Sequence, residues 1–335
     1  MNAYLVKKYK SPMEAGEVAE PTVGDRDVLV DIHAAGVNLL DAKVRDGEFK
    51  IFLPYKAPFA LGHDLAGVVT RVGPAVTRFS MGDEVYGRVR DGRIGTFAER
   101  IAVHEDDLAK KPATLSMAEA ASVPLVALTA WQALVERGNL QPGQKVLIQA
   151  GSGGVGIYAI QLAKHLGATV ATTTGTSNVE WVRALGADTV IDYRSEDFEE
   201  VLNNYDVVLD SQGGDTLAKS LRVLKPGGIA IGIAGPPDAD FARQLGRLPL
   251  RPVMALLSWQ TRRAARRRRV RYSFLFMQAS GSQLEEITKL IDSGTLRHVV
   301  DQTYPFAEAP EALAYVEAGH SKGKVVVVAD SSDRD

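Results

Sequence analysis

Short apolar runs separated by glycine, proline and aspartate dominate the first part of the chain, up to about residue 110. Four runs carry this pattern: DVLVDIHAAGVN (27–38), DLAGVVTRVG (64–73), DEVYGRV (83–89) and FAERIAV (97–103). Runs of this length, with turn-forming residues between them, are typical of strands in an antiparallel sheet. The pattern therefore predicts a β-rich, barrel-like N-terminal part.

The pattern becomes helical in LSMAEAASVPLVALTAWQALVERG, residues 115–138. Ser116 and Glu119 form an S-x-x-E capping box, in which each side chain can bond the other residue's backbone N–H at the start of a helix. Pro124 has no backbone N–H and disfavours helical geometry in the residue before it. We therefore expect Pro124 to divide this stretch into two helices.

From Gln141 onward, short apolar strands alternate with helices of about ten residues. Strands at 145–150, 169–174, 189–193, 206–211 and 228–234 are predicted, with helices at 158–167, 179–186 and 216–225. Strands that are apolar on both faces, with a helix after each, are typical of a parallel, doubly wound sheet. The pattern predicts an α/β domain here.

The C-terminal part returns to a mixture of strands and helices. Strands are expected in YSFLFM (272–277), HVVDQTYPF (298–306) and KVVVVA (324–329), and helices near 282–293 and 307–318.

Composition narrows the classes of function that remain. A length of 335 residues suggests about two domains, and a net charge of −2 gives no general field that would recruit nucleic acid or an anionic membrane. The absence of cysteine excludes disulfides, thiolate metal sites and a cysteine nucleophile. The first residues lack the apolar core of an export signal, and no run of about 18 apolar residues exists. We therefore expect a cytoplasmic protein without a transmembrane helix.

A glycine-rich turn follows the predicted strand 145–150 and carries the most information. It has the form G-x-G-x-x-G between a strand and a helix, inside a strand–helix–strand unit of about 30 residues. The first glycine permits a tight turn, the second lets the backbone approach a pyrophosphate, and the third lets the helix pack closely on the strand. Backbone N–H groups and the helix dipole would then hold the phosphates. The residues concerned are Gly151, Ser152, Gly153, Gly154, Val155 and Gly156. The alternative is a flexible glycine turn without a ligand.

The next strand ends in TTTGTSN, residues 172–178, where an NAD-preferring site usually carries an acidic residue. With no carboxylate in this segment, hydroxyl donors such as Thr174 can accommodate a 2′-phosphate. Tyr193 and Arg194, which end the following strand, could add a donor and a positive charge. We therefore expect NADP(H) to be preferred over NAD(H); if these residues only end a strand, the preference stays open.

The chain as a whole resembles the zinc-independent medium-chain dehydrogenases/reductases, in particular the quinone oxidoreductase and alkenal/enone reductase branch. The resemblance covers nearly the whole chain in eight ordered segments: AAGVNLLDAKVRDG (34–47), ALGHDLAGVVTRVG (60–73), MGDEVYG (81–87), GTFAER (95–100), LTAWQAL (128–134), VLIQAGSGGVGIYAIQLAKHLGA (146–168), LGADTVIDY (185–193) and GKVVVV (323–328).

The resemblance implies two domains and an active site in the cleft between them. A GroES-like catalytic domain is expected from residues 1–122 plus 258–335, and an NAD(P)-binding Rossmann domain from 123–257. The family also implies a homodimer, with the strand at 272–277 as a candidate contact.

The resemblance also assigns roles to individual residues. Asn38 stands where zinc-dependent relatives carry a catalytic cysteine, so it should lie beside nicotinamide and substrate, with Asp41 close by. Tyr55 is the candidate proton donor, although a packing role is the simpler interpretation. The implied cofactor contacts beyond the glycine turn are Asp41, Thr129, Thr174, Ser177, Asn178, Tyr193, Ile233, Ala234, Phe274 and Phe276. Asn178 departs from the lysine often found there, which weakens the expected NADP preference.

The implied reaction is transfer of a hydride from NADPH to a quinone or to the β-carbon of an α,β-unsaturated carbonyl. Charge on the carbonyl oxygen would be stabilised by the Asn38 amide, a ribose hydroxyl or water instead of a metal. Two alternatives remain: a redox-sensing or scaffold protein that binds NADP(H) without turnover, and a zinc-free alcohol dehydrogenase.

His63, in ALGHDLAGVV, stands where metal-dependent relatives hold zinc. A catalytic zinc needs three protein ligands, and here the cysteine position is Asn38 while His33 and His104 have no zinc-ligand spacing. We therefore expect no metal, and a structural role for His63 and Asp64.

The segment TRRAARRRRVR, residues 261–271, holds seven arginines and follows the apolar stretch LPLRPVMALLSW (248–259). Such a combination can bind an anionic membrane surface or nucleic acid. The simpler interpretation, which the spacing favours, is a solvated helix that joins the two domains and exposes Arg262, Arg266 and Arg269.

Overall fold

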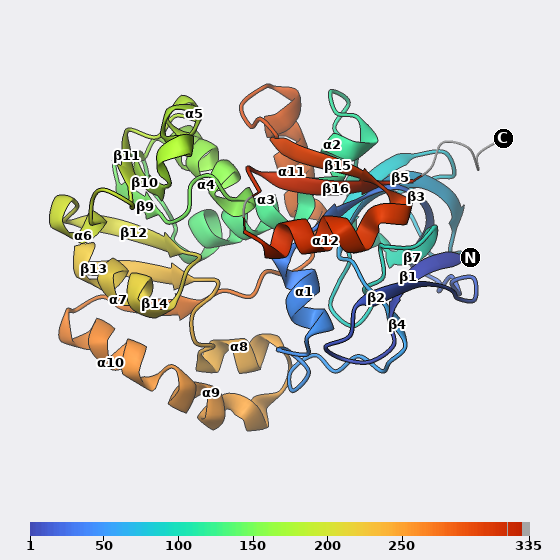
Figure 1. Cartoon of the computed structure of the whole chain (residues 1–335), viewed down its shortest axis with the longest axis horizontal. Helices are drawn as coiled ribbons and strands as arrows, with labels where there is room; N and C mark the ends of the chain where they lie inside the picture. The colour runs from blue at the N-terminus through green and yellow to red at the C-terminus, as the bar shows by residue number, and fades with distance from the viewer. Residues whose placement is uncertain (320, 330–335) are drawn as a thin grey trace. The chain divides into compact units, whose positions relative to one another are not determined.

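The computed structural model describes residues 1–319 and 321–329 and divides into two compact units. Unit 1 comprises Met1–Leu128 and Gln278–Asp335, and unit 2 is the continuous segment Thr129–Met277. Both ends of the chain therefore contribute to unit 1, as the sequence predicts. Figure 1 labels the elements along the chain.

The described residues of unit 1 form two sheets. A small antiparallel sheet has the order β2-β1-β4, and a larger one has the order β15-β16-β3-β5-β6-β8, with β7 also paired to β3. All pairs in the larger sheet are antiparallel except β15 with β16. The strands of the two sheets are β1 (Asn2–Val6), β2 (Met13–Glu17), β3 (Asp27–Val37), β4 (Phe59–Ala60), β5 (Asp64–Val72), β6 (Glu84–Arg88), β7 (Arg100–His104), β8 (Leu108–Lys110), β15 (Val300–Pro305) and β16 (Lys324–Val328).

Helices lie around these strands: α1 (Leu39–Arg45), α2 (Met117–Ala121), α3 (Pro124–Trp131), α11 (Gly281–Asp292) and α12 (Ala309–Glu317). The predicted capping box at Ser116 starts α2, and Pro124 starts α3, which confirms the predicted division into two helices. α3 crosses the boundary between the units at Leu128.

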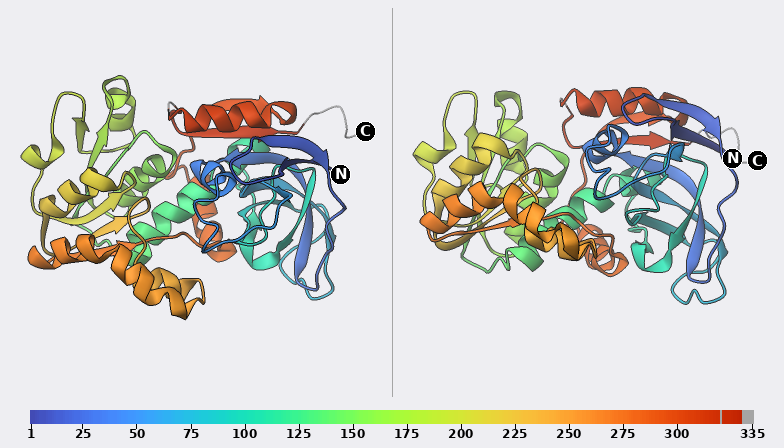
Figure 2. Two further views of the ribbon diagram at one scale, coloured as in Figure 1. Left: turned by 60° about the horizontal axis from the view of Figure 1, so that its bottom comes forward. Right: turned by 90° about the horizontal axis from the view of Figure 1, so that it is seen from below.

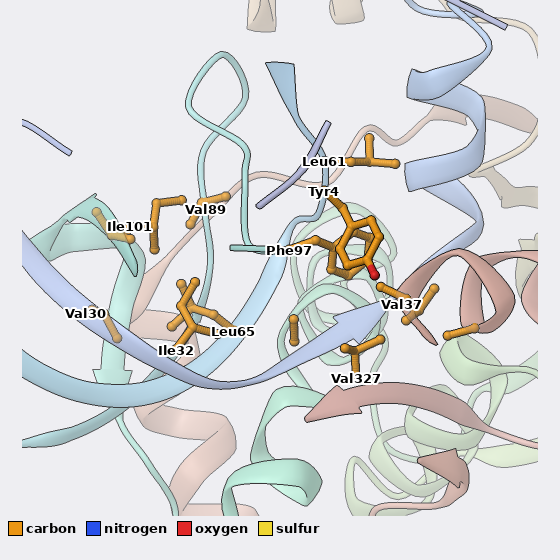
Figure 3. Close-up of a cluster of buried hydrophobic side chains, with 14 of the residues drawn as sticks. Tyr4, Val30, Ile32, Val37, Leu61, Leu65, Val89, Phe97, Ile101 and Val327 are labelled. Carbon is orange, nitrogen blue, oxygen red and sulfur yellow. The ribbon is translucent and has the colours of Figure 1, made fainter. Parts of the chain in front are cut away.

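β16, near the end of the described chain, pairs with β3 near its beginning, and Figure 1 shows the red strand beside the blue one. β3 is buried along almost its whole length because it has β5, β7 and β16 as partners. Its Val30, Ile32 and Val37 face a core that Leu65 of β5 and Val327 of β16 complete (Figure 3). The apolar positions of distant segments thus form one core.

Unit 2 is built on six parallel strands in the order β11-β10-β9-β12-β13-β14. From β9 the strands β10 and β11 are added on one side of the sheet, and β12, β13 and β14 are then added on the other side. This is the strand order of a doubly wound dinucleotide-binding sheet. The predicted α/β fold is therefore confirmed. The strands are β9 (Lys145–Ile148), β10 (Thr169–Thr174), β11 (Thr189–Asp192), β12 (Tyr205–Asp210), β13 (Leu224–Gly232) and β14 (Arg271–Phe274).

The helices of unit 2 follow its strands: α4 (Gly154–His165), α5 (Val179–Ala184), α6 (Phe198–Val201), α7 (Gly214–Val223), α8 (Ala239–Gln244), α9 (Arg251–Leu257) and α10 (Trp259–Arg267). α9 and α10 follow one another between α8 and the edge strand β14 (Figure 2). No described helix is long and apolar enough to cross a membrane.

The second boundary differs from the predicted break at 257/258. β14 pairs with β13, so the segment that follows residue 257 belongs to the sheet of unit 2 up to Met277. α10 is consequently part of unit 2 and packs on α7 and β14, so its predicted role as a helix joining two domains is wrong. Arg266 and Arg269 are exposed as predicted, but Arg262 is half-buried. Arg269 lies beyond the end of α10 with a φ of +59°, so the three arginines do not share one helical face.

We predict that Leu147→Ala destabilises the protein by about 2–5 kcal/mol, because Leu147 is completely buried in β9 and its removal leaves a cavity. Leu256→Ala, at a leucine that is 74% exposed, serves as the control and should change stability by about 0.5 kcal/mol or less. Denaturant-induced unfolding measures both. Equal effects of the two substitutions would contradict the placement of β9 at the centre of the sheet.

Candidate functional site

The glycine-rich turn lies at the carboxyl end of β9, where the strand order of the sheet reverses. β10 lies on one side of β9 and β12 on the other. In sheets of this kind, ligands bind outside the strand ends at that switch point. The predicted phosphate-binding residues Gly151–Gly156 therefore occupy the position that a dinucleotide site requires.

Close packing requires two of the three glycines. A Cβ on Gly151 would lie 2.3 Å from the Thr172 hydroxyl oxygen, and one on Gly156 would lie 2.4 Å from the Ala150 carbonyl oxygen. At Gly153 the nearest atom, the same carbonyl oxygen, would be 3.4 Å away, an ordinary contact. The third glycine thus has its predicted packing role, and the protein leaves open the space at the second glycine into which a pyrophosphate would come.

The start of α4 can bind an anion. Gly153 is its N-cap and supplies no side-chain cap, so only backbone groups face outward from the first turn. The first N–H groups of a helix have no acceptor within the helix, and the helix dipole makes this end positive. The Gly153 N–H already donates to the Ala150 carbonyl at 3.0 Å, so the backbone N–H groups of residues 152, 154 and 155 are those left for a phosphate.

A buried series of side-chain hydrogen bonds holds the strand ends next to the glycine turn. Thr173 donates a hydrogen bond to Gln149 Oε1 (2.7 Å), Gln149 donates to Ser220 Oγ (3.2 Å), and Ser220 donates to Asp210 Oδ2 (3.0 Å). Burial raises the pKa of Asp210, which also accepts the backbone N–H of Gly213 at 2.7 Å. These hydrogen bonds link β10, the end of β9, α7 and β12 across the switch point. Sequence reasoning missed them because the residues are far apart in the sequence.

Thr174 ends β10 with a buried side chain that is 1% exposed. Its hydroxyl oxygen has no hydrogen-bond partner among the described residues. A buried hydroxyl without a partner costs about 1–3 kcal/mol. Because this oxygen is itself closed off from the surface, the predicted contact of Thr174 with a cofactor stays a prediction.

Tyr193 and Arg194 meet the backbone after β10. A Cβ on Gly175 would lie 3.3 Å from the Tyr193 hydroxyl and 3.7 Å from Arg194 Nε. Tyr193 is 61% exposed, so its hydroxyl can reach a ligand. The two side chains and the Gly175 turn therefore form one surface beside Thr174.

Sequence reasoning missed a carboxylate close to this surface. Asp192 pairs with Thr174 in the sheet register and accepts hydrogen bonds from the Thr176 side chain and the Arg194 backbone N–H. These bonds lower its pKa, so Asp192 is ionised at neutral pH. Strand ends cannot be aligned from one sequence, which is why this acid was not recognised.

The other two predicted ribose contacts lie on the same short 3₁₀ turn, Thr176–Asn178. Ser177 is exposed. Asn178 is half-buried, and its side-chain oxygen accepts a hydrogen bond from Trp181 Nε1 at 3.0 Å. Asn178 therefore has a structural partner within the chain, whereas Ser177 is accessible to a ligand.

The residues predicted to line the nicotinamide also lie in unit 2. Ile233 is half-buried and its backbone N–H bonds the Asp210 carbonyl, while Ala234 is exposed. Phe274 and Phe276 are buried, with both rings packed on Phe241 at centroid distances of 5.2 and 5.1 Å. Their side chains thus belong to the core. Thr129, in α3, is also buried.

In unit 1, the predicted catalytic residue Asn38 belongs to a buried polar network. Its Nδ2 donates to Asp64 Oδ2 (3.0 Å) and to the Gly36 carbonyl (3.3 Å), and its Oδ1 accepts from Lys324 Nζ (2.5 Å). Both amide hydrogens of Asn38 are therefore engaged. In this arrangement the amide holds its neighbours and has no spare donor for a substrate oxygen.

Asp41 is completely buried and both of its carboxylate oxygens are occupied. One accepts the Asn38 backbone N–H at 2.8 Å and forms the capping box that starts α1, and the other accepts His63 Nδ1–H at 2.5 Å. The prediction that Asp41 contacts the cofactor is therefore wrong for its side chain. His63 is 1% exposed, and this hydrogen bond holds its ring against α1.

Lys324 enters the same network from β16 with its ammonium group buried. It donates to the Val37 carbonyl at 2.7 Å and lies 3.8 Å from Asp64 Oδ2. Burial raises the pKa of Asp64 to about 6, against the opposing effect of Lys324, and burial lowers the pKa of Lys324. Lys324 was missed because a lysine at the start of an apolar strand usually faces solvent.

The described residues contain no group of three or more His, Asp or Glu side chains placed to hold a metal ion. Around His63 the second nitrogen or sulfur ligand of a catalytic zinc site is absent, since position 38 is an asparagine and the chain has no cysteine. The residues around His63 therefore do not fit a zinc site of that type.

Tyr55, the predicted proton donor, packs in an aromatic cluster. Its ring lies 5.3 Å from Phe59, its backbone exchanges hydrogen bonds with the Tyr9 hydroxyl, and its own hydroxyl accepts the Gly92 N–H at 3.2 Å. Burial raises its pKa to about 12. A phenol with this pKa is a weaker acid than an exposed tyrosine, which favours the packing role.

Known proteins resemble this chain over most of its length. The sequence model of the alcohol dehydrogenase GroES-like domain matches residues 24–113, and that of the zinc-binding dehydrogenases matches residues 185–327. The mouse "NAD(P)H oxidoreductase RTN4IP1, mitochondrial" is 37% identical over 90% of this chain and 81% of its own length. The "NADPH-dependent alkenal/one oxidoreductase, chloroplastic" of Arabidopsis thaliana is 36% identical over 92% and 74%.

Solved structures of other proteins have the same fold. The quinone oxidoreductase from Coxiella burnetii superimposes with a TM-score of 0.86 at 30% identity, covering 98% of this chain and 99% of that one. The Escherichia coli quinone oxidoreductase complexed with NADPH gives a TM-score of 0.79 at 25% identity, over 98% and 100%. This chain therefore belongs to the medium-chain dehydrogenase/reductase superfamily, in its quinone oxidoreductase and alkenal/enone reductase branch.

Proposed function

We propose that this NAD(P)H-dependent oxidoreductase uses NADPH to reduce quinones or the activated C=C bond of α,β-unsaturated carbonyls. The observation that carries the proposal is the glycine turn at the switch point, together with the Tyr193–Arg194 surface that meets the backbone after β10. The names of the relatives support the substrate class, since one is an alkenal/one oxidoreductase and another a 2-methylene-furan-3-one reductase.

Several separate segments of unit 2 would contact the cofactor. Backbone N–H groups of residues 152, 154 and 155 would hold the pyrophosphate, and the exposed Ser177 and Tyr193 side chains would contact a ribose. Backbone atoms near Ile233 and Phe274 would line the nicotinamide ring. When bound, NADPH supplies the hydride, and the chain supplies orientation and exclusion of water.

The preference for NADPH rests on a balance of charges around the 2′ position. Arg194 and the Tyr193 hydroxyl attract a 2′-phosphate, whereas the ionised Asp192 repels it. Asp192 already accepts two hydrogen bonds, one of them from the backbone of Arg194, so its charge is partly compensated. The positive charge of Arg194 also acts on Asp192, so a 2′-phosphate would share this guanidinium with the carboxylate.

The substrate end needs a donor for charge that develops on a carbonyl oxygen. The Asn38 amide is engaged and Tyr55 is a weak acid, so we propose that a ribose hydroxyl or water donates, with the proton coming from solvent. Reduction of an enone or quinone tolerates this arrangement because the substrate delivers no proton to the protein. Oxidation of an alcohol would need a base beside the hydroxyl. A homodimer, a cytoplasmic location and the absence of a metal stay predictions.

We predict that the purified protein consumes NADPH with a quinone, or with a 2-alkenal or an enone, and that absorbance of NADPH reports it. Binding of NADPH without turnover of either substrate class would reject the proposal in favour of a sensor or scaffold. Turnover of NADP with alcohols alone would indicate the dehydrogenase.

Gly156→Ala should weaken cofactor binding, by about tenfold or more, because its Cβ would overlap the Ala150 carbonyl.

We predict that Arg194→Gln raises KM for NADPH about 10–100-fold and leaves KM for NADH nearly unchanged, since only NADPH carries the 2′-phosphate that a charged hydrogen bond would hold. Arg183→Gln is the control, because Arg183 is an exposed arginine on the neighbouring helix α5 that pairs with Glu180. If Arg194→Gln affected both cofactors equally, the assignment of Arg194 to the 2′-phosphate would be wrong.

The raised pKa of Asp64 predicts a pH dependence of stability. In the unfolded chain Asp64 ionises near pH 4, but in the fold it ionises near pH 6, so the folded state holds the extra proton between these values. The free energy of unfolding of the wild type, relative to Asp64→Asn, should therefore fall by up to about 3 kcal/mol from pH 4 to pH 6 and stay level above.

Denaturant titrations at several pH values measure this difference. Asp106→Asn, at an exposed carboxylate, is the matched control and should retain the pH dependence of the wild type. Parallel profiles for the wild type and Asp64→Asn would show that burial does not raise the pKa of Asp64.

A further inference from the structure

The most uneven distribution of charge in the chain lies in residues 241–271. This segment holds ten arginines, no lysine and no acidic residue, although the whole chain has a net charge of −2. The rest of the chain is therefore net acidic. Within the described residues, Arg243 forms an ion pair with Asp240, but none of the arginines from Arg251 to Arg271 forms one. A solvated helix usually balances such a run with acidic neighbours.

The same segment carries an unusual amount of exposed apolar surface. Half of the large hydrophobic side chains that are exposed in the described chain lie within residues 248–259: Leu248 (57%), Val253 (50%), Leu256 (74%), Leu257 (53%) and Trp259 (51%). Single exposed leucines are common on protein surfaces, but a cluster of them marks a contact site. We call residues 248–271 the α9–α10 surface.

α9 and α10 have a defined inner face, so the exposure is not a consequence of loose packing. Met254, Ser258 and Ala265 are buried at helical spacing, and Ser258 Oγ donates to the Met254 carbonyl at 2.9 Å. The exposed apolar residues of α9 and the arginines of α10 lie on the remaining faces. The Arg263 guanidinium also lies 5.0 Å from the centre of the Trp259 ring, so cation and aromatic ring are paired on this surface.

We propose that the α9–α10 surface binds peripherally to a bilayer that contains anionic phospholipid. Exposed leucine, valine and tryptophan enter the boundary between headgroups and acyl chains, while arginines bond lipid phosphates, the combination that an interfacial helix requires. Tryptophan favours this boundary because one edge of its ring is polar. The proposal does not depend on the reaction that the protein catalyses.

Two other occupants fit the surface less well. Nucleic acid would engage the arginines but would leave the leucines and valine of α9 in water. A second copy of the chain, placed on this surface by a twofold axis, would bring the same unpaired arginines of both copies together. An anionic bilayer complements both the charge and the apolar side chains.

The full-length protein would be sedimented with phosphatidylcholine vesicles and with vesicles that also contain phosphatidylglycerol, at low and at high salt. We expect binding to the anionic vesicles only, weakened by salt. Each arginine near an anionic membrane surface contributes about fivefold to the partition coefficient, so Arg263→Gln/Arg267→Gln should lower it at least tenfold. Leu256→Ser/Leu257→Ser should also lower it, at either salt concentration.

The matched controls are Arg71→Gln/Lys289→Gln for charge and Met81→Ser for apolar exposure, all at exposed positions of unit 1. They should bind like the wild type. In addition, tryptophan fluorescence should shift to shorter wavelength with anionic vesicles, and Trp259→Phe should abolish the shift. Circular dichroism checks that each variant folds.

Four outcomes would overturn the proposal: no binding to anionic vesicles at low salt; equal loss in the control and surface variants; binding of a short RNA or DNA with no binding of vesicles; or dissociation of an oligomer in Leu256→Ser/Leu257→Ser, which would identify the surface as a contact between copies.

Discussion

The burial of the Asp64 carboxylate is the constraint around which unit 1 is arranged. A buried carboxylate is costly unless charge and hydrogen bonds compensate it. Here the Asn38 amide and the Leu125 backbone N–H bond it directly, and the Lys324 ammonium lies nearby. These partners come from the end of β3, the start of α3 and the start of β16. One side chain therefore ties together segments from both ends of the chain.

A second constraint of the same kind sets the geometry of unit 2. The glycine turn keeps its shape because Gly151 and Gly156 allow contacts too close for a Cβ, and because the chain from Thr173 to Asp210 fixes the strands on both sides of the switch point. The two networks differ in the polar groups that stay without a hydrogen-bond partner. In unit 1 the Asn38 amide and the Asp41 and Asp64 carboxylates bond one another or their neighbours. In unit 2 the first turn of α4 has no side-chain cap, and the Thr174 hydroxyl has no partner among the described residues.

Local patterns in the sequence predict local features well. Strand–turn–helix spacing locates the glycine turn, and Pro124 locates the break between α2 and α3. Features that depend on partners far along the chain are not visible in the same way. Lys324 resembles an exposed strand-end lysine until its position beside Asn38 is known. Asp192 resembles a surface acid until the register of β10 and β11 places it next to Thr174. β14 was assigned to the wrong domain because its pairing with β13 leaves no local signal.

The discontinuous composition of unit 1 has a consequence for folding during synthesis. Unit 2 is one continuous segment, and all six strands of its sheet are available once the chain has emerged to about Met277. Unit 1 cannot be completed at that point, because its ammonium for Asp64 arrives 286 residues after Asn38. Until β16 emerges from the ribosome, β3 lacks one neighbour and Asp64 lacks its cation. The central unit can therefore be native while β3, which is made before it, still lacks β16, which is made after it.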